Sequence, residues 1–327
     1  MTFETDLRRF GPPACETVSP RDALTYCARL TSTHYENFSV VTWLTPREHR
    51  PAFQSIYAFC RWSDDLGDEV GDPARSLELL DWWRGELDAM FDGRARHPVM
   101  IALRETVGRY GIPPGPFHAL IDAFVQDQTV VDYATFDQLR DYCTRSADPV
   151  GRLVLYVAGA FDEANARLSD STCTALQLAN FWQDVARDLD IGRIYLPRED
   201  RERFGVRDDD LKARRFTPAF GEMLKFEVAR TRELFDAGRP LVARIPGEFA
   251  VDVDLFSRGG LEILKKIEAC GYDVLSARPS LGKAAKVRLL ARAMLGLARA
   301  RLTGGGARRL DPAPPLAAAA PRGESPR

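Results

Sequence analysis

Two pairs of aspartates, each spaced four residues apart, carry the chemistry that this sequence offers. The first pair, Asp64 and Asp68, follows Tyr57 and Arg61. At about 100° per residue these four side chains fall within an arc of roughly 60° on one helix face. Since like charges one helical turn apart repel each other, the pair predicts a compensating cation close to it.

The second pair, Asp184 and Asp188, shares an arc of roughly 80° with Gln177 and Asn180 on another helix. The remaining positions there are largely apolar, which predicts a buried helix, and a buried polar face is costly unless it is paired or binds a metal. One such pair is more often a solvated helix face, but two pairs with polar companions favour a Mg²⁺ site. A metal held in this way assists the departure of a diphosphate group.

The segments that position these pairs are predicted to be helical almost throughout. Ser19-Pro20 and Thr45-Pro46 are typical helix starts, in which a capping hydroxyl precedes proline. No sustained alternation of polar and apolar residues is present, so the sequence predicts an all-α fold without a sheet. Helices are expected at 19–30, 46–70, 74–91, 97–110, 114–130, 136–147, 149–161, 169–190, 217–243, 247–270 and 280–302.

We expect one large helical domain over residues 19–302, between an N-terminal segment 1–18 and a disordered tail 303–327 that is rich in Pro, Ala and Arg. Residues 190–217 are expected to connect two halves of the bundle. The scattered cysteines argue against a zinc site, and a net charge of -2 argues against a nucleic-acid binder. With no signal peptide and no apolar run long enough to span a membrane, a cytoplasmic location is expected.

The charge is unevenly distributed along the chain. Residues 278–327 hold 11 Lys and Arg against 2 Asp and Glu, whereas the rest holds 34 against 45. Within the basic part, 283–302 is expected to form an apolar helix with arginines interleaved. It either closes the bundle or contacts the inner face of an anionic membrane, and both alternatives stay open.

Five stretches together resemble the squalene/phytoene synthase family, the head-to-head trans-isoprenyl diphosphate synthases. The resemblance spans about Thr33 to Lys286 and implies an isoprenoid synthase fold, a single helical bundle around a central cavity. The stretches are His34–Phe38, Tyr57–Glu69, Tyr142–Gly151, Gln177–Asp188 and Gly192–Pro197.

The resemblance also implies a role for individual residues. Mg²⁺, or alternatively Mn²⁺, would be held on a prenyl diphosphate by Asp64, Asp68, Asp184 and Asp188, and Tyr142 would lie near the reacting carbons. The residues implied to bind substrate or support its site are His34, Asn37, Phe38, Tyr57, Arg61, Gln177, Asn180, Arg193 and Tyr272.

Two departures from the condensing members of the family narrow the expected reaction. Those members usually carry Arg directly before the first aspartate of the second pair, where this chain has Gln183. They also differ at Ser146–Gly151, which here reads S-A-D-P-V-G. Losing a guanidinium removes a strong partner for a second diphosphate. Gln183 and the S-A-D-P-V-G stretch both resemble the corresponding residues of the bacterial hydroxysqualene synthases of hopanoid biosynthesis.

Members of that branch convert presqualene diphosphate and water to hydroxysqualene and diphosphate. No NADPH is expected, and the chain has no dinucleotide-binding G-x-G-x-x-G after a strand. The alternatives are a synthase that condenses two prenyl diphosphates to presqualene diphosphate, squalene or phytoene, and a non-catalytic scaffold. The intact aspartate pairs argue against the scaffold. Contacts with other enzymes of the same pathway stay open.

Overall fold

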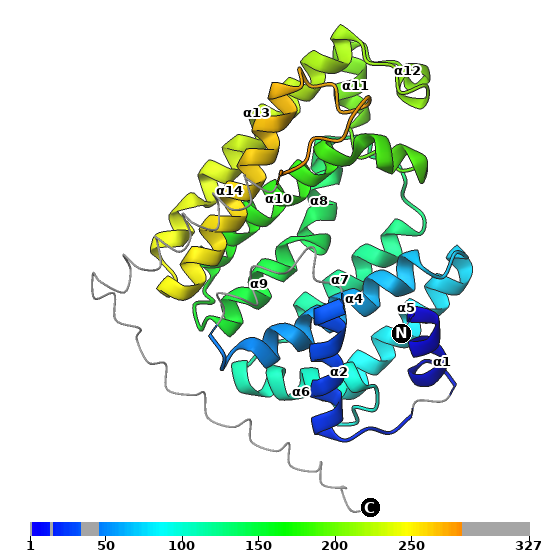
Figure 1. Cartoon of the computed structure of the whole chain (residues 1–327), viewed down its shortest axis with the longest axis vertical. Helices are drawn as coiled ribbons and strands as arrows, with labels where there is room; N and C mark the ends of the chain where they lie inside the picture. The colour runs from blue at the N-terminus through cyan, green and yellow to red at the C-terminus, as the bar shows by residue number, and fades with distance from the viewer. Residues whose placement is uncertain (1, 14–15, 34–45, 283–327) are drawn as a thin grey trace, which may run out of the picture.

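The computed structural model describes residues 2–13, 16–33 and 46–282, and this part of the chain contains helices and no strand (Figure 1). The expected all-α fold is therefore confirmed. The α-helices are α1 (Phe3–Phe10), α2 (Pro20–Thr33), α4 (Arg50–Asp68), α5 (Pro73–Phe91), α6 (Pro98–Tyr110), α7 (Gly115–Asp127), α8 (Phe136–Ser146), α9 (Asp148–Val157), α10 (Glu163–Asp190), α11 (Arg198–Phe204), α12 (Asp208–Lys212), α13 (Pro218–Gly238) and α14 (Gly247–Ala269), with a 3₁₀ helix η1 (Arg239–Ala243).

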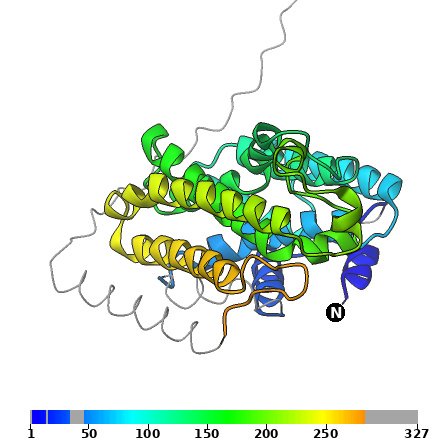
Figure 2. The same ribbon diagram turned by 90° about the horizontal axis from the view of Figure 1, so that it is seen from above.

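The helices form two groups that meet along α7, α8 and α9. In one group α2 packs against α4 and α6, and α4 also contacts α5 and α7. In the other, the long helix α10 packs against α13 and α14, which run side by side in Figure 2. Each of α4 and α10 therefore belongs to a different group, and each carries one aspartate pair.

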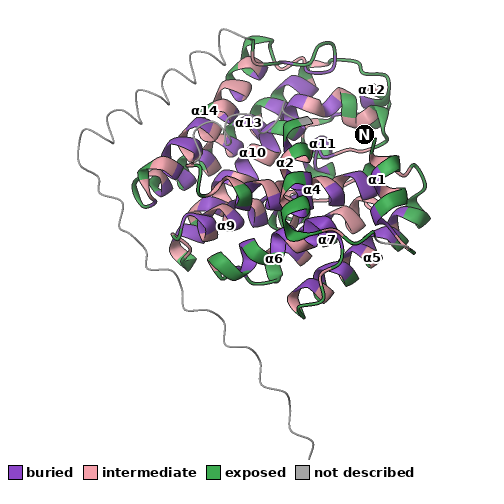
Figure 3. Ribbon diagram, turned by 60° about the horizontal axis from the view of Figure 1, so that its bottom comes forward, coloured by how far each residue is buried: buried purple, intermediate pink, exposed green. Residues whose placement is uncertain are grey.

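Apolar side chains fill the interior of both groups, and Figure 3 shows how most helices divide into a buried and an exposed face. Trp62, Trp83 and His97 form one dense contact, with the two indole rings stacked at 5.5 Å between centroids. Trp182 on α10 is fully buried and donates to Thr231 on α13 across 2.8 Å. This packing fixes the rotation of α4 and α10 about their axes, and with it the direction in which the aspartates point.

The start of the helix that carries the first pair was predicted wrongly. We expected it at Pro46, whereas residues 47–49 form a turn and α4 begins at Arg50. Pro51 explains the difference, because it lacks an N–H and its ring collides with the carbonyl four residues earlier, so it belongs in the first turn. The predicted stop is confirmed, since α4 ends at Asp68 and Gly71 adopts a φ of 75°.

Other helix boundaries also differ from the predicted ones. The helix expected from 169 begins at Glu163, where the Asp162 side chain caps it by accepting from the N–H of Asn165 at 2.7 Å. The helix expected to reach 161 ends at Val157, and Gly159 follows with a φ of 61°. The expected connection 190–217 contains the short helices α11 and α12.

The N-terminal segment also carries structure that the sequence did not indicate. It contains α1, whose Phe10 is buried and lies 5.3 Å from the ring of Tyr26. The predicted helix 280–302 and the tail 303–327 lie almost entirely outside the described residues. No helix among the described residues is long and apolar enough to cross a membrane.

Candidate active site

Asp64, the first member of the first aspartate pair, has its cation on its own helix. Arg61 on α4 donates to Asp64 across 3.0 Å and forms a second ion pair with Asp65. Partial burial raises the pKa of Asp64, with Arg61 opposing that shift and Asp68 adding to it. Burial raises the pKa of Asp65 to about 7 despite the same arginine. The spacing i, i+3 and i, i+4 accounts for both contacts without any other element.

The second aspartate pair takes its cation from far along the chain. Asp184 on α10 accepts two hydrogen bonds from Arg278, which lies in the segment after α14. One is donated by Nε of Arg278 and the other by its Nη2, across 3.0 Å. Asp188 lies one turn further on, where burial and then the neighbouring Asp184 raise its pKa to about 7. Two carboxylates one turn apart thus carry more negative charge than Arg278 removes.

Arg193 lies between the two pairs. It donates to Asp68 across 3.1 Å, and its charge lowers the pKa values of Asp64, Asp127 and Asp188 relative to what burial alone would give. Burial disfavours the charge on Arg193 itself, but Tyr195, Asp127 and Asp68 together raise its pKa. The C-terminal ends of α4 and α10 therefore lie on either side of the Arg193 guanidinium and form one site.

Tyr142 on α8 is buried beside this site. Its hydroxyl donates to Asp127 at the end of α7 across 2.8 Å, and its ring lies about 6 Å from those of Tyr133, Phe181 and Tyr195. Burial raises the pKa of Asp127 to about 6, with Arg193 and Tyr142 opposing the shift. The second oxygen of Asp127 is buried and has no hydrogen-bond partner in the described part of the chain.

Within residues 2–13, 16–33 and 46–282, no three His, Cys, Asp or Glu side chains are grouped so that they could hold a metal ion. Three of the four aspartates instead form ion pairs with arginines, Asp64 with Arg61, Asp68 with Arg193 and Asp184 with Arg278. The donor set nevertheless suits a hard cation, because it consists of carboxylate oxygens with surplus charge and a buried oxygen without a partner. The four aspartates as metal ligands stay a prediction.

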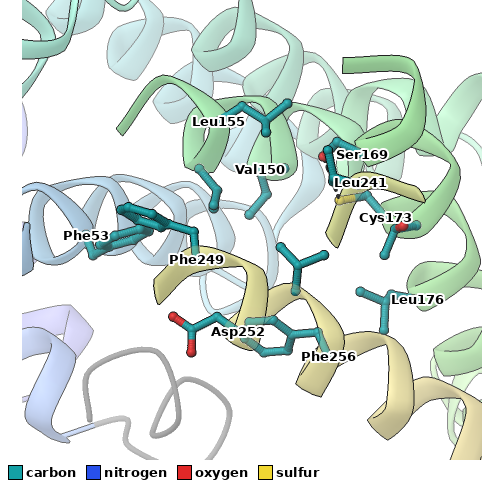
Figure 4. A pocket seen from close by; sticks show the side chains of 14 residues that line it. Phe53, Val150, Leu155, Ser169, Cys173, Leu176, Leu241, Phe249, Asp252 and Phe256 are labelled. Carbon is teal, nitrogen blue, oxygen red and sulfur yellow. Dashed lines mark hydrogen bonds between the residues drawn. The ribbon is translucent and has the colours of Figure 1, made fainter. Parts of the chain in front are cut away.

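A largely apolar cavity lies between α4, α9, α10, η1 and α14 (Figure 4). Phe53, on its wall, stands eleven residues before Asp64 on α4, or about 16 Å along the helix axis. Among the described residues that line the cavity, Asp252 on α14 has the only carboxyl group, and burial raises its pKa to about 7. The cavity is lined by Phe53, Val150, Gly151, Val154, Leu155, Ser169, Thr172, Cys173, Leu176, Leu241, Phe249, Asp252, Val253 and Phe256.

A model of the squalene/phytoene synthase family matches residues 31–285, which is most of the chain. The chain belongs to the squalene/phytoene synthase family. This confirms the resemblance carried by the motifs, and the isoprenoid synthase fold with it. Family members act on prenyl diphosphates, and such a substrate requires both a site for an anion and an apolar cavity; α4 and α10 carry the aspartate pairs and also line the apolar cavity.

Individual relatives agree with the family match. The crystal structure of squalene synthase HpnC from Alicyclobacillus acidocaldarius superposes with a TM-score of 0.75 at 48% identity, covering 77% of this chain and 95% of that one. Hydroxysqualene synthase of Rhodopseudomonas palustris is 36% identical over 64% of this chain and 71% of its own length. Phytoene synthase of Arthrospira platensis is 30% identical over 81% of this chain and 91% of its own.

The other residues that were predicted to bind substrate or support its site lie in several different parts of the chain. Tyr57 lies one turn before Arg61 on α4, and Gln177 and Asn180 precede Asp184 on α10, where Gln177 is half-buried and Asn180 exposed. Tyr272 lies apart from both pairs, since its charged neighbours belong to α13 and the end of α14. Its role as a cavity residue stays a prediction. His34, Asn37 and Phe38 lie outside the described residues.

The S-A-D-P-V-G stretch has a packing role in this structure. Asp148 accepts from Thr174 on α10 across 2.9 Å, and Pro149 occupies the first turn of α9. A side chain at Gly151 would collide with Ser169 and Cys173, so glycine allows α9 to approach α10 beside the cavity. The motif therefore shapes the cavity wall and brings no reactive group to the acidic site.

Sequence reasoning missed three residues of the site, namely Asp127, Tyr195 and Arg278. Tyr195 belongs to the quoted G-R-I-Y-L-P stretch, and its ring stacks on Phe181 at 3.8 Å between centroids. Asp127 ends a helix with no second acid at helical spacing, and Arg278 lies at the start of the basic part of the chain, just before the predicted helix 280–302. Neither position differs in its local pattern from an ordinary surface charge.

Proposed function

We propose that this protein converts presqualene diphosphate and water to hydroxysqualene and diphosphate, with Mg²⁺ or Mn²⁺ and without NADPH. The observation that carries the proposal is the combination of an acidic site, an apolar cavity lined by the same helices α4 and α10, and Gln183 at the position where condensing relatives usually have Arg. The hydroxysqualene synthase and HpnC relatives support the same reading.

Asp64, Asp68, Asp184 and Asp188 would hold the metal ions. Bound Mg²⁺ would supply Lewis acidity that neutralises charge on the leaving diphosphate. Arg193 adds a fixed cation between the two pairs, and Arg61 keeps the first pair oriented along α4. These groups bind the anionic end of the substrate, whereas the hydrocarbon chains occupy the apolar cavity.

The aromatic cluster around Tyr142 provides the environment for the cation that remains after the diphosphate has left. Ring faces attract positive charge and contain no strong nucleophile. Tyr142 also keeps its hydroxyl on Asp127, which fixes the ring orientation. Exclusion of bulk water by the surrounding rings would restrict capture of the cation to one positioned water molecule.

Gln183 separates this reaction from the condensing alternative. It is buried, and its amide donates to the carbonyl of Pro279 rather than to the acidic site. Condensation of two prenyl diphosphates requires charge for a second diphosphate, which a neutral amide engaged elsewhere does not supply. The similarity to phytoene synthases keeps that condensation, or squalene formation, as the second candidate function.

The deciding experiment supplies the purified full-length protein with Mg²⁺ and presqualene diphosphate, with and without NADPH, and identifies products by mass spectrometry. We expect hydroxysqualene under both conditions. Squalene formed only with NADPH, or consumption of farnesyl or geranylgeranyl diphosphate supplied alone, would establish the second candidate. No turnover of any of these diphosphates would point to a non-catalytic protein of the same fold.

A further inference from the structure

Arg201 on α11 is a buried arginine whose guanidinium nitrogens are all hydrogen-bonded. Only 1% of its side chain is exposed. Its Nε donates to the carbonyl of Leu196 across 3.1 Å and its Nη2 donates to Asp132 across 2.6 Å, while its Nη1 donates to Asp208. A buried guanidinium is costly unless such partners satisfy it, so the three contacts fix the segments that provide them relative to α11.

Two of these partners belong to segments that carry residues of the acidic site. Leu196 stands three residues after Arg193, the arginine between the two aspartate pairs. Asp132 stands five residues after Asp127, which ends α7. Arg201 therefore joins the segment after α10 to the segment after α7, and each of these segments contributes to the site.

A backbone hydrogen bond joins the same two segments. The N–H of Ile194 donates to the carbonyl of Val131 across 2.7 Å. This bond lies next to Arg193, and the bond that Leu196 accepts lies two residues further along the chain. One bond alone would let the stretch pivot about it, whereas two fixed points set the direction in which the Arg193 side chain leaves the backbone.

Arg198 shares a carboxylate with Arg201 but contacts it from the solvent side. Its Nη2 donates to the other oxygen of Asp132 across 2.5 Å, and its side chain is 52% exposed. When Arg201 is removed, Asp132 therefore keeps a cation, and Asp208 is 59% exposed to solvent. Since no buried charge is left unpaired, the loss of Arg201 acts mainly on Leu196 and the stretch before it.

We propose that Arg201 is a positioning residue for Arg193. By holding Leu196 against Asp132, it directs the Arg193 guanidinium toward Asp68 and the anionic end of the substrate. This rests on the proposed function, because it acts on a guanidinium that we assign to the binding of the diphosphate. The hydrogen bonds of Arg201 itself go to none of the four aspartates of the two pairs.

The test compares Arg201→Met with wild type in the full-length protein. Met fills much of the same space without the donors, and replacing a buried ion pair by an apolar group of similar volume often leaves stability unchanged. Calorimetry should show that inorganic pyrophosphate with Mg²⁺ binds about tenfold more weakly, as for the loss of a charge-assisted hydrogen bond. Arg198→Ala is the matched control, and Arg258→Ala, which removes an exposed ion pair with Asp254 on α14, is a remote one. Both should stay within about twofold of wild type.

A double-mutant cycle shows whether Arg201 acts through Arg193. In an Arg193→Gln background, Arg201→Met should change the pyrophosphate affinity by less than about twofold, because the guanidinium that it positions is already gone. A merely structural role would weaken binding by the same factor in both backgrounds. Arg201→Lys keeps the charge but not the planar fork, so its affinity should lie between those of wild type and Arg201→Met.

The outcomes separate this inference from the proposed function. If wild type binds no pyrophosphate with Mg²⁺, the proposed function fails. If wild type binds it, and Arg201→Met either binds it equally well or loses the same factor in both backgrounds, the proposed function stands and the positioning role of Arg201 is overturned. Circular dichroism checks that each variant is folded, and Arg201→Lys replaces Arg201→Met in the cycle if the latter is not.

Discussion

The two aspartate pairs have the same spacing on a helix but obtain their counter-charge in different ways. Asp64 is neutralised by Arg61 from one turn earlier on α4. Asp184 is neutralised by Arg278, and α11, α12, α13 and α14 lie between these two residues in the chain. The counter-charge of Asp64 is therefore local, whereas that of Asp184, like that of Asp68 with Arg193, depends on the packing of separate segments.

This difference indicates where the site can change. A cation one turn away stays beside its aspartate as long as the helix exists. A cation from a separate segment stays beside its aspartate only while that segment is packed against the helix that carries the aspartate.

The largest effect is expected when either pair loses its first carboxylate. Asp64→Asn and Asp184→Asn should each reduce turnover of presqualene diphosphate about thousandfold, because each removes a charge that would bind metal, and such charge stabilisation amounts to several kcal/mol. Steady-state kinetics at saturating Mg²⁺ measures the loss. Asp254→Asn, which removes the paired carboxylate on the exposed side of α14, is the control. Normal turnover in either active-site variant would show that the pairs are not equivalent in function.

The next largest effect is expected for the arginine between the pairs. Arg193→Gln removes the ion pair with Asp68 and leaves the charges of Asp127 and Asp188 less compensated. Turnover should fall about a hundredfold, equivalent to about 2.7 kcal/mol of lost transition-state stabilisation. The same kinetic assay measures it, with Arg258→Ala beside it. A loss no larger than that of the control would mean that Arg193 only neutralises the first pair and does not link it to the second.

A smaller effect is expected for Tyr142. Tyr142→Phe keeps the ring but removes the donor to Asp127, whose other oxygen already lacks a partner among the described residues. We expect turnover to fall about tenfold and the free energy of unfolding to fall by about 1–3 kcal/mol, the cost of leaving a buried acceptor unpaired. Kinetics and urea denaturation measure the two quantities. An unchanged unfolding free energy would show that Asp127 finds another donor.

The smallest effect concerns pH and Asp188. Its pKa of about 7 in the folded protein exceeds the value of about 3.9 of an unfolded chain, so the folded protein binds more protons between these values. This contribution to stability is present at low pH and lost as the pH rises through 7. Between pH 5 and pH 8, metal-free wild type should lose about 1 kcal/mol more unfolding free energy than Asp188→Asn, allowing for partial solvent screening.

Urea denaturation at a series of pH values in the presence of a chelator measures this difference. The other buried carboxylates titrate in both proteins, so comparison of the two isolates Asp188. Identical pH dependence in wild type and Asp188→Asn would mean that the charge of Asp184 and Asp188 is already compensated, which contradicts the contrast between the two pairs.

Sequence patterns were reliable where the physical cause is local. The helical period placed Asp64 with Arg61 and Asp184 with Gln177 on common faces, and the apolar positions gave the all-α fold. The start of α4 failed because the effect of Pro51 on the preceding turn outweighs the capping pattern at Thr45 and Pro46. The short helices α11 and α12 were missed because few apolar positions define their faces.

The sequence by itself determined the family, the helical fold and the two aspartate pairs, because motif identity and helical periodicity depend on residues at most a few turns apart. Only the tertiary structure decided which cations reach the pairs from other segments of the chain. It placed Arg193 between them, Asp127 on Tyr142 and Arg278 on Asp184, contacts between residues 15 to 125 positions apart. Such pairings arise from the packing of separate helices, and no spacing rule along the chain specifies them.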